Sequence, residues 1–269
     1  MSKLNLLGVT IDAITMEQAA DEIVAYSKST NPAKYITKPY VEFLDLAATN
    51  LEVRDLLNQS LLTLPDSVAL QWAALYQSGK KRSIIRLMIT LSQILTQPKA
   101  LTSVIPERFA GADFSWFLLE KAATEKLSIY LIGHPQNWSI TQTADAIQRR
   151  LPRLRVVGTF DGLKVNDHEP ELLAELINLQ PNLILIGIGF PRQERLMSRL
   201  APKLKSGILI GEGGTFDYES FGGTIKRAPV IMRRLGLEWL WRLILQPKRI
   251  VRQFAIPRFI WKVYRGKKI

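Results

Sequence analysis

The second half of the chain alternates between continuous apolar runs and apolar positions at helical spacing. The runs are nearly free of polar side chains and lie at residues 127–132, 154–158, 182–187 and 207–211. Stretches with helical spacing separate them at residues 113–125, 139–150, 168–178 and 192–200. Such alternation is typical of a parallel sheet whose two faces are both covered by helices. The pattern therefore predicts an α/β fold with a Rossmann-like parallel sheet flanked by helices.

The first part of the chain, residues 1–77, predicts a smaller N-terminal α/β lobe. A helix from Met16 to Ser29 is expected, with Thr15 as its N-cap and Gln18 as the capping-box partner. The other expected elements are a strand pair at 4–14, strands at 35–37 and 61–64, and helices at 41–50 and 68–77.

Residues 78–105 differ from the segments on both sides, because they contain an apolar stretch from Ser83 to Gln97. The stretch is too short to span a bilayer, which takes about 20 residues. Two interpretations stay open, a helix packed against the protein and an interfacial helix that touches lipid. The Rossmann-like region then covers residues 106–225.

All of the net charge of +12 lies in the last segment, residues 226–269. The chain has 36 Lys and Arg and 24 acidic residues; this segment holds thirteen of the former and one of the latter, Glu238, which leaves 23 of each elsewhere. Pro247 and Pro257 are expected to break it into short helices, at 237–245 and 250–254. We expect a basic helical appendage that meets a negatively charged membrane or nucleic acid.

Composition excludes several kinds of chemistry. The chain has no cysteine, so disulfides and thiolate nucleophiles are excluded. Its two histidines, His134 and His168, are far apart, and no Asp-x-Asp pair occurs. We therefore expect no metal site. No cofactor is expected for the favoured function either. The sequence has neither a signal-peptide core nor an apolar run of bilayer length, so any membrane contact is expected from the surface.

Three glycine-rich turns follow the predicted strands, around Gly133, Gly189 and Gly213. Ligands of parallel sheets bind beyond the carboxyl ends of the strands, and glycine lets backbone N–H groups approach a phosphate closely. The turns lack both the P-loop pattern and the G-x-G-x-x-G spacing. They indicate a nucleotide site of another kind, with purely structural turns as the alternative.

Five motifs in the second half stand out: Pro191-Arg192-Gln193-Glu194, Gly213-Gly214-Thr215-Phe216-Asp217, Lys226-Arg227-Ala228-Pro229, Leu237-Glu238-Trp239-Leu240-Trp241-Arg242-Leu243 and Gln246-Pro247-Lys248-Arg249. With looser matches at 40–44, 64–67 and 106–114, they resemble, in order and over nearly the whole chain, the WecG/TagA/CpsF family of bacterial glycosyltransferases. Three positions depart from the family pattern, Tyr40, Ser67 and Leu163, and they put the identity of the donor sugar in doubt.

The resemblance implies a definite reaction. Members transfer N-acetylmannosamine or a related sugar from a UDP-sugar to an undecaprenyl-diphosphate-linked acceptor, with inversion and without a metal. The protein would then be a cytoplasmic enzyme, peripheral at the inner face of the cell membrane, that serves teichoic acid or polysaccharide synthesis. Residues 106–225 would bind the nucleotide sugar. No nucleic-acid partner is expected, and a homo-oligomer is left open.

The resemblance also assigns residues. Asp66 would be the general base and Thr37 a second catalytic residue, although the register leaves Lys38 open for the position of Thr37. The nucleotide-sugar site would comprise Gly133, Gly189, Gln193, Glu194, Gly213 and Asp217. The diphosphate and lipid would be met by Arg227, Arg233, Arg234, Arg242, Arg249 and Arg252. The structural alternatives are an N-cap for Asp66, a first-turn position for Gln193, a loop cap for Asp217 and headgroup contact alone for the arginines.

Two other functions remain open on sequence alone. A nicotinamide-dependent oxidoreductase could use a similar sheet, but the missing G-x-G-x-x-G disfavours it. A non-catalytic protein that docks on a membrane or a nucleic acid would explain the basic segment equally well.

Overall fold

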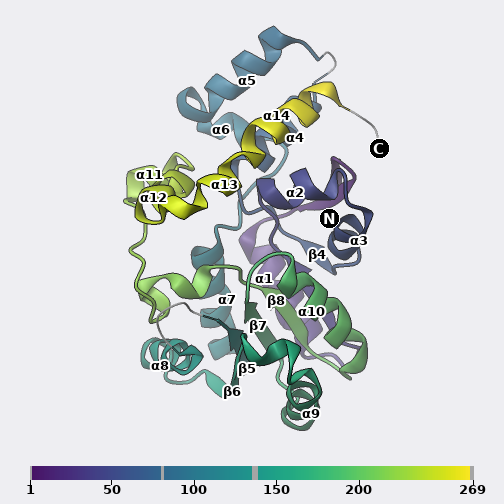
Figure 1. Ribbon diagram of the computed structural model, residues 1–269, viewed down its shortest axis with the longest axis vertical. Coiled ribbons are helices and arrows are strands. Elements are labelled where there is room, and N and C mark those ends of the chain that lie inside the picture. Colours follow the sequence, from purple (N-terminus) through teal and green to yellow (C-terminus); the bar gives the residue numbers. More distant parts are fainter. Residues whose placement is uncertain (1, 80–81, 135–138, 267–269) are drawn as a thin grey trace.

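The structure is a computed structural model that describes residues 2–79, 82–134 and 139–266, without the side chain of Arg234 (Figure 1). Its centre is a six-stranded sheet in which all neighbouring strands are parallel. The strand order is β4 (Leu62–Thr63), β3 (Lys34–Thr37), β8 (Ile208–Gly211), β7 (Leu183–Gly187), β5 (Ser128–Gly133) and β6 (Arg155–Asp161). The predicted α/β fold with a Rossmann-like parallel sheet is confirmed.

Helices cover both faces of this sheet. One face packs against α1 (Met16–Ser27), α7 (Gly111–Thr124) and α8 (Ile140–Arg150), and the other against α9 (Glu169–Leu179) and α10 (Arg192–Leu200). Successive strand residues point to opposite faces, so Leu131 lies in the first core and Ile132 in the second. This explains why the strands read as continuous apolar runs.

A third core lies beyond the carboxyl edge of the sheet. It is built from the antiparallel pair β1 (Ser2–Leu6) and β2 (Val9–Ala13), from α2 (Val41–Ala47), α3 (Leu51–Asn58) and α4 (Val68–Gln77), and from the last helix, α14 (Ala255–Arg265). Residues 1–77 therefore contribute both to this lobe and, through β3 and β4, to the main sheet. The predicted capping box at Thr15 and Gln18 is present.

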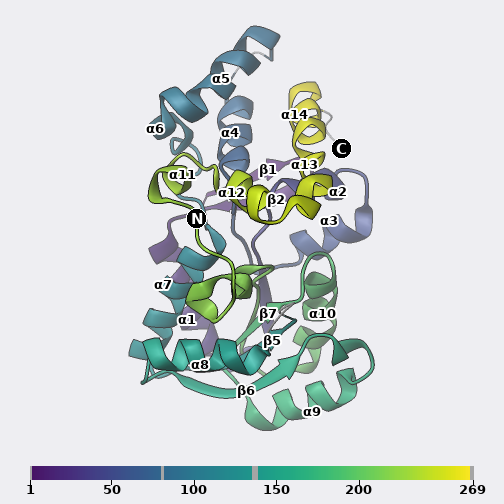
Figure 2. The same cartoon turned by 60° about the vertical axis from the view of Figure 1, so that its left-hand side comes forward.

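The basic segment folds onto this lobe. Its helix α14 buries Phe259 and Val263 in the third core, and Arg258 and Lys262 pair with Asp45 of α2 at 2.8 and 2.7 Å. The preceding helices are α11 (Val230–Arg234), α12 (Glu238–Leu245) and α13 (Ile250–Gln253) (Figure 2). The predicted appendage is helical, and it is also part of the globular body.

Two predicted boundaries were wrong. The expected helix at 41–50 ends at Ala47, and Asn50 caps a separate helix, α3, by accepting a hydrogen bond from the backbone N–H of Val53. Pro257 does not break the tail, because it lies in the first turn of α14, where backbone N–H groups have no partner within the helix. The break falls at Phe254 instead.

Residues 78–105 form α5 (Ile84–Thr96) and α6 (Pro98–Leu101). One side of α5 packs on α4, where Trp72 donates a hydrogen bond to the hydroxyl of Thr90. The other side exposes its apolar residues to solvent, including Ile85 and Met88. Among the described helices, none is both long and apolar enough to cross a membrane.

Candidate functional site

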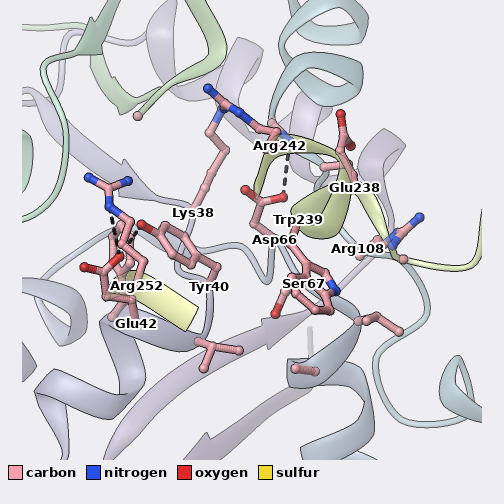
Figure 3. Close-up of a pocket in the computed structure, with 18 of the residues that line it drawn as sticks. Lys38, Tyr40, Glu42, Asp66, Ser67, Arg108, Glu238, Trp239, Arg242 and Arg252 are labelled. Atoms are coloured by element: carbon pink, nitrogen blue, oxygen red, sulfur yellow. Dashed lines mark hydrogen bonds and ion pairs between the residues drawn. The ribbon is translucent and has the colours of Figure 1, made fainter. Parts of the chain in front are cut away.

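A cavity of about 490 Å³ opens where the carboxyl edge of the sheet meets the third core and the tail. Figure 3 shows part of its wall, with Lys38, Asp66 and Arg242 around a common space. Seven of the predicted site residues line the cavity: Asp66, Gly189, Gln193, Gly213, Arg242, Arg249 and Arg252. Residues that are far apart in sequence, from three strand ends and the tail, are thus brought together.

Asp66 follows the short strand β4 in a turn. Its backbone N–H donates to the carbonyl of Pro39, and its carboxylate accepts a hydrogen bond of 3.2 Å from the N–H of Gly111, the first residue of α7. The alternative role as N-cap of α4 is not what the structure shows, since Ser67 holds that position. Burial raises the pKa of Asp66 to about 7, against the lowering influence of Lys38. A carboxylate with such a pKa is suited to accept a proton near neutral pH.

A buried ion pair between Lys38 and Glu212 forms part of the cavity wall. The Nζ of Lys38 at the end of β3 lies 2.7 Å from the carboxylate of Glu212 after β8, and both side chains are at most 3% exposed. The hydroxyl of Ser115 in α7 donates to the same carboxylate oxygen at 2.5 Å. The ion pair joins neighbouring strands and holds a cation at the cavity wall, where it lowers the pKa of Asp66.

Gln193 and Glu194, at the start of α10, are joined by a hydrogen bond between their side chains. The amide nitrogen of Gln193 donates to Glu194 at 2.8 Å, which leaves the amide oxygen to accept a hydrogen bond of 2.9 Å from the N–H of Gly213. Gly213 has φ of +58°, a conformation that glycine adopts without strain. Glu194 does not line the cavity; it fixes the orientation of Gln193, which does.

Glu194 gives a prediction about stability and pH. Burial raises its pKa from 4.5 to about 7, so the folded protein binds this proton more tightly than the unfolded chain does. Stability should therefore fall as pH rises from 4.5 towards 7, by about 3 kcal/mol in total. Glu194→Gln should remove this loss and raise the melting temperature at about pH 8 more than at about pH 4. Thermal unfolding at both pH values measures the change in melting temperature, with the exposed Glu219→Gln as the control. Equal changes in melting temperature at both pH values would contradict the raised pKa of Glu194.

Three arginines of the tail gather at the cavity: Arg242, Arg249 and Arg252. Burial and the two neighbouring cations lower the pKa of Arg249 to about 10. Arg242 is 9% exposed and pairs with Asp217 at 2.8 Å, yet its Nε is buried without a hydrogen-bond partner among the described residues. Crowded cations with an unsatisfied donor are chemically suited to bind an anion such as a diphosphate.

The structure places the other predicted residues away from the cavity wall. Thr37 is fully buried and donates to Ser60, so the position at the cavity belongs to Lys38. Gly133 is packed under Ile140 and Phe216, which leave no room for a side chain. Asp217 lies outside the cavity lining and pairs with Arg242, which does line it.

Two of the six tail arginines hold the tail in place. Arg227 pairs with Glu238 and with Asp113 of α7, and Arg233 pairs with the same Asp113. The side chain of Arg234 lies outside the described part of the structure. For Arg227 and Arg233 the contact with diphosphate or lipid therefore stays a prediction, beside the ion pairs that they form within the protein.

Several cavity residues were not singled out from the sequence. They include Arg108, Glu212, Tyr218, Glu238 and Trp239. Arg108 and Glu238 both influence the pKa of Asp66, in opposite directions. Glu238 and Trp239 lie within the motifs named from the sequence and Arg108 lies within the looser match at 106–114, which was the available signal. Glu212 stands inside the glycine-rich turn after β8.

Comparison with known proteins places this site in context. The sequence matches the profile described as "Glycosyl transferase WecG/TagA/CpsF family" over residues 4–100 and 93–269. Two curated relatives come from Staphylococcus aureus, strains NCTC 8325 and MRSA252, and both are named N-acetylglucosaminyldiphosphoundecaprenol N-acetyl-beta-D-mannosaminyltransferase. Each is 28% identical to this chain over an alignment that covers 99% of it and 94% of the relative.

Proposed function

Because the chain belongs to the WecG/TagA/CpsF family of glycosyltransferases, we propose that it transfers N-acetylmannosamine or a related sugar from a UDP-sugar to an undecaprenyl-diphosphate-linked sugar. The name of these relatives supports the acceptor and the transferred sugar. The observation that carries the proposal is the single cavity in which Asp66 and three arginines lie together. Family membership sets the oxidoreductase and non-catalytic interpretations aside.

In the proposed reaction Asp66 takes the proton from the acceptor hydroxyl. The hydroxyl oxygen attacks the anomeric carbon from the face opposite the diphosphate, the new C–O bond forms and the bond to UDP breaks. The configuration at the anomeric carbon is therefore inverted. The pKa of about 7 leaves a large fraction of Asp66 ionised at neutral pH while it still accepts a proton well.

The leaving UDP carries negative charge that must be neutralised. Arg242, Arg249 and Arg252 at the cavity are the proposed partners of the diphosphate, with Gln193 and the backbone at Gly213 beside the nucleotide. Fixed cations stabilise the departing charge in the transition state. On this proposal a divalent metal is not needed.

Arg249→Gln tests this assignment. We expect UDP to bind about tenfold more weakly or worse, because a charge-assisted contact in a partly buried site is lost. Removal of one of three mutually repelling cations should at the same time stabilise the unliganded protein. Calorimetric titration with UDP and a thermal melt measure the two effects. The neighbouring Lys248→Gln, an exposed cation outside the cavity wall, should change neither; equal effects of the two variants would refute the role of Arg249.

We also propose that the enzyme sits peripherally on the inner face of the cell membrane. The support is a set of exposed apolar side chains on α5 and the tail: Ile84, Ile85, Met88, Ile89, Val230, Ile231, Ile244, Leu245, Ile250, Val251, Phe254 and Trp261. Exposed Lys226 and Lys248 add attraction to anionic lipid of about 1 kcal/mol each. Segments 78–105 and 226–269 would thus face the membrane, while 1–77 and 106–225 supply the base and the nucleotide site.

The proposed function is tested by sugar transfer in the presence of EDTA. Native protein is incubated with UDP-N-acetylmannosamine and a lipid-diphosphate-linked N-acetylglucosamine, and UDP release and the anomeric configuration of the product are measured. We expect turnover that EDTA does not reduce, and an inverted product. No turnover with any UDP-sugar would overturn the proposal, and loss of activity in EDTA would overturn its metal-independent part.

A further inference from the structure

The cavity has a second, apolar end that the transfer chemistry does not use. Its walls there are Leu91, Ile94 and Leu95 on α5, and Ile256 and Ile260 on α14, and its floor includes Val68, Ala69 and Trp72 on α4. Both α5 and α14 pack against α4, and Figure 2 shows them on its two sides. The result is an apolar groove between two helices that continues into the site holding Asp66.

One wall of the groove is a face of α5. Ile94 and Leu95 follow Leu91 by three and four residues, so the three side chains lie on one face of α5. That helix is fixed on α4 by buried Leu87 and by the hydrogen bond from Trp72 to Thr90. The face is therefore held in position at the groove.

Along the opposite wall of the groove, a charged side chain is followed by apolar side chains. Arg252, Ile256 and Ile260 follow one another at four-residue spacing through α13 and α14, and all three line the cavity. From Ile256 to Ile260 on α14 the apolar part of this wall runs about 6 Å at the rise of a helix. A ligand that matches this wall carries a diphosphate at one end and a hydrocarbon chain at the other.

We infer that this groove, made by Leu91, Ile94 and Leu95 of α5 opposite Ile256 and Ile260 of α14, binds the first isoprene units of the acceptor's prenyl chain. The inference rests on the proposed function, because the acceptor class comes from there. Continuity with the arginines and Asp66 selects the prenyl chain as occupant over a separate partner. Segment 78–105 would then contribute to acceptor recognition through its inner face and to membrane contact through its outer face.

Binding of short, water-soluble prenyl diphosphates tests the groove without a membrane and without turnover. Farnesyl diphosphate, geranyl diphosphate and methyl diphosphate are titrated into the native chain by calorimetry. We expect farnesyl diphosphate to bind at least about tenfold more tightly than methyl diphosphate, since burial of two methylene groups already contributes that much. Equal affinities for the three compounds would overturn the inference.

Two matched variants locate the effect. Leu91→Asn should reduce the affinity for farnesyl diphosphate about tenfold and leave that for methyl diphosphate unchanged, because it removes one apolar wall residue. Met88→Asn, on the exposed side of the same helix, should leave both unchanged. The ratio of the two affinities is insensitive to a general loss of stability. If Leu91→Asn and Met88→Asn lower both affinities equally, the groove is not the prenyl site.

The outcome is independent of the transfer assay. A protein that transfers sugar but shows no preference for the longer chain would retain the proposed function and refute the groove. A protein that prefers farnesyl diphosphate, with the preference lost in Leu91→Asn, but transfers no sugar would support a prenyl-diphosphate site and refute the proposed function.

Discussion

Asp66→Asn is expected to lower kcat for sugar transfer about 10³-fold, because a positioned general base contributes roughly 10² to 10⁴ to the rate. The amide keeps the size of the side chain and its acceptor oxygen for the N–H of Gly111, so the turn after β4 should be preserved. What is lost is the ability to accept the proton of the acceptor hydroxyl. Initial rates at saturating donor and acceptor measure the effect.

The pH dependence of kcat/KM tests the role of Asp66 independently. Burial raises the pKa of Asp66 to about 7, so the base is protonated and inactive at lower pH. The native enzyme should lose kcat/KM as pH falls below about 7, with one inflection near that value. The control variant is Asp55→Asn, an exposed acid of α3, which should keep both the rate and the profile. Activity that survives Asp66→Asn at the native level would remove Asp66 from the mechanism.

Lys38→Met is expected to destabilise the fold by about 3 to 5 kcal/mol, because it leaves the carboxylate of Glu212 buried without its cation. The Oε2 atom of Glu212 would then accept a hydrogen bond from Ser115 and none from residue 38. Urea unfolding measures the loss. Lys34→Met, at the exposed start of the same strand, should cost little.

A double variant separates the lost attraction from the buried charge. Lys38→Met with Glu212→Leu replaces the ion pair by apolar groups and should recover most of the stability, as such replacements are often neutral. In the single variant the pKa of Asp66 should also rise, since Lys38 lowers it. The acidic limb of the kcat/KM profile would then move to higher pH. An unaltered unfolding free energy in Lys38→Met would show that the ion pair does not support the fold.

The sheet and its helices were predictable because their signals are local. Strands β5, β7 and β8 are buried on both faces, so each is an unbroken apolar run, and the capping box at α1 can be read from Thr15 and Gln18. What failed was the junction between α2 and α3. Both helices bury residues in the same core, and the residue that separates them, Asn50, is neither glycine nor proline: it combines an extended backbone with a capping side chain.

The site was only partly predictable, because its geometry depends on contacts distant in sequence. Asp66, Gln193 and Arg242 were identified from motifs and lie at one cavity. The motifs did not distinguish Arg242 from Arg227, which lies fifteen residues earlier and is used in ion pairs with Asp113 and Glu238. Likewise, the choice between Thr37 and Lys38 depends on which of two neighbouring strand residues faces the cavity, and a shift of one residue reverses it.

The most direct test of the account is a crystal structure of the protein with bound UDP. The account predicts the nucleotide in the cavity at the carboxyl edge of the sheet. Its diphosphate should lie within hydrogen-bonding distance of Arg242 or Arg249, with the terminal phosphate towards Asp66. A nucleotide bound outside this cavity, with the arginines unengaged, would contradict it.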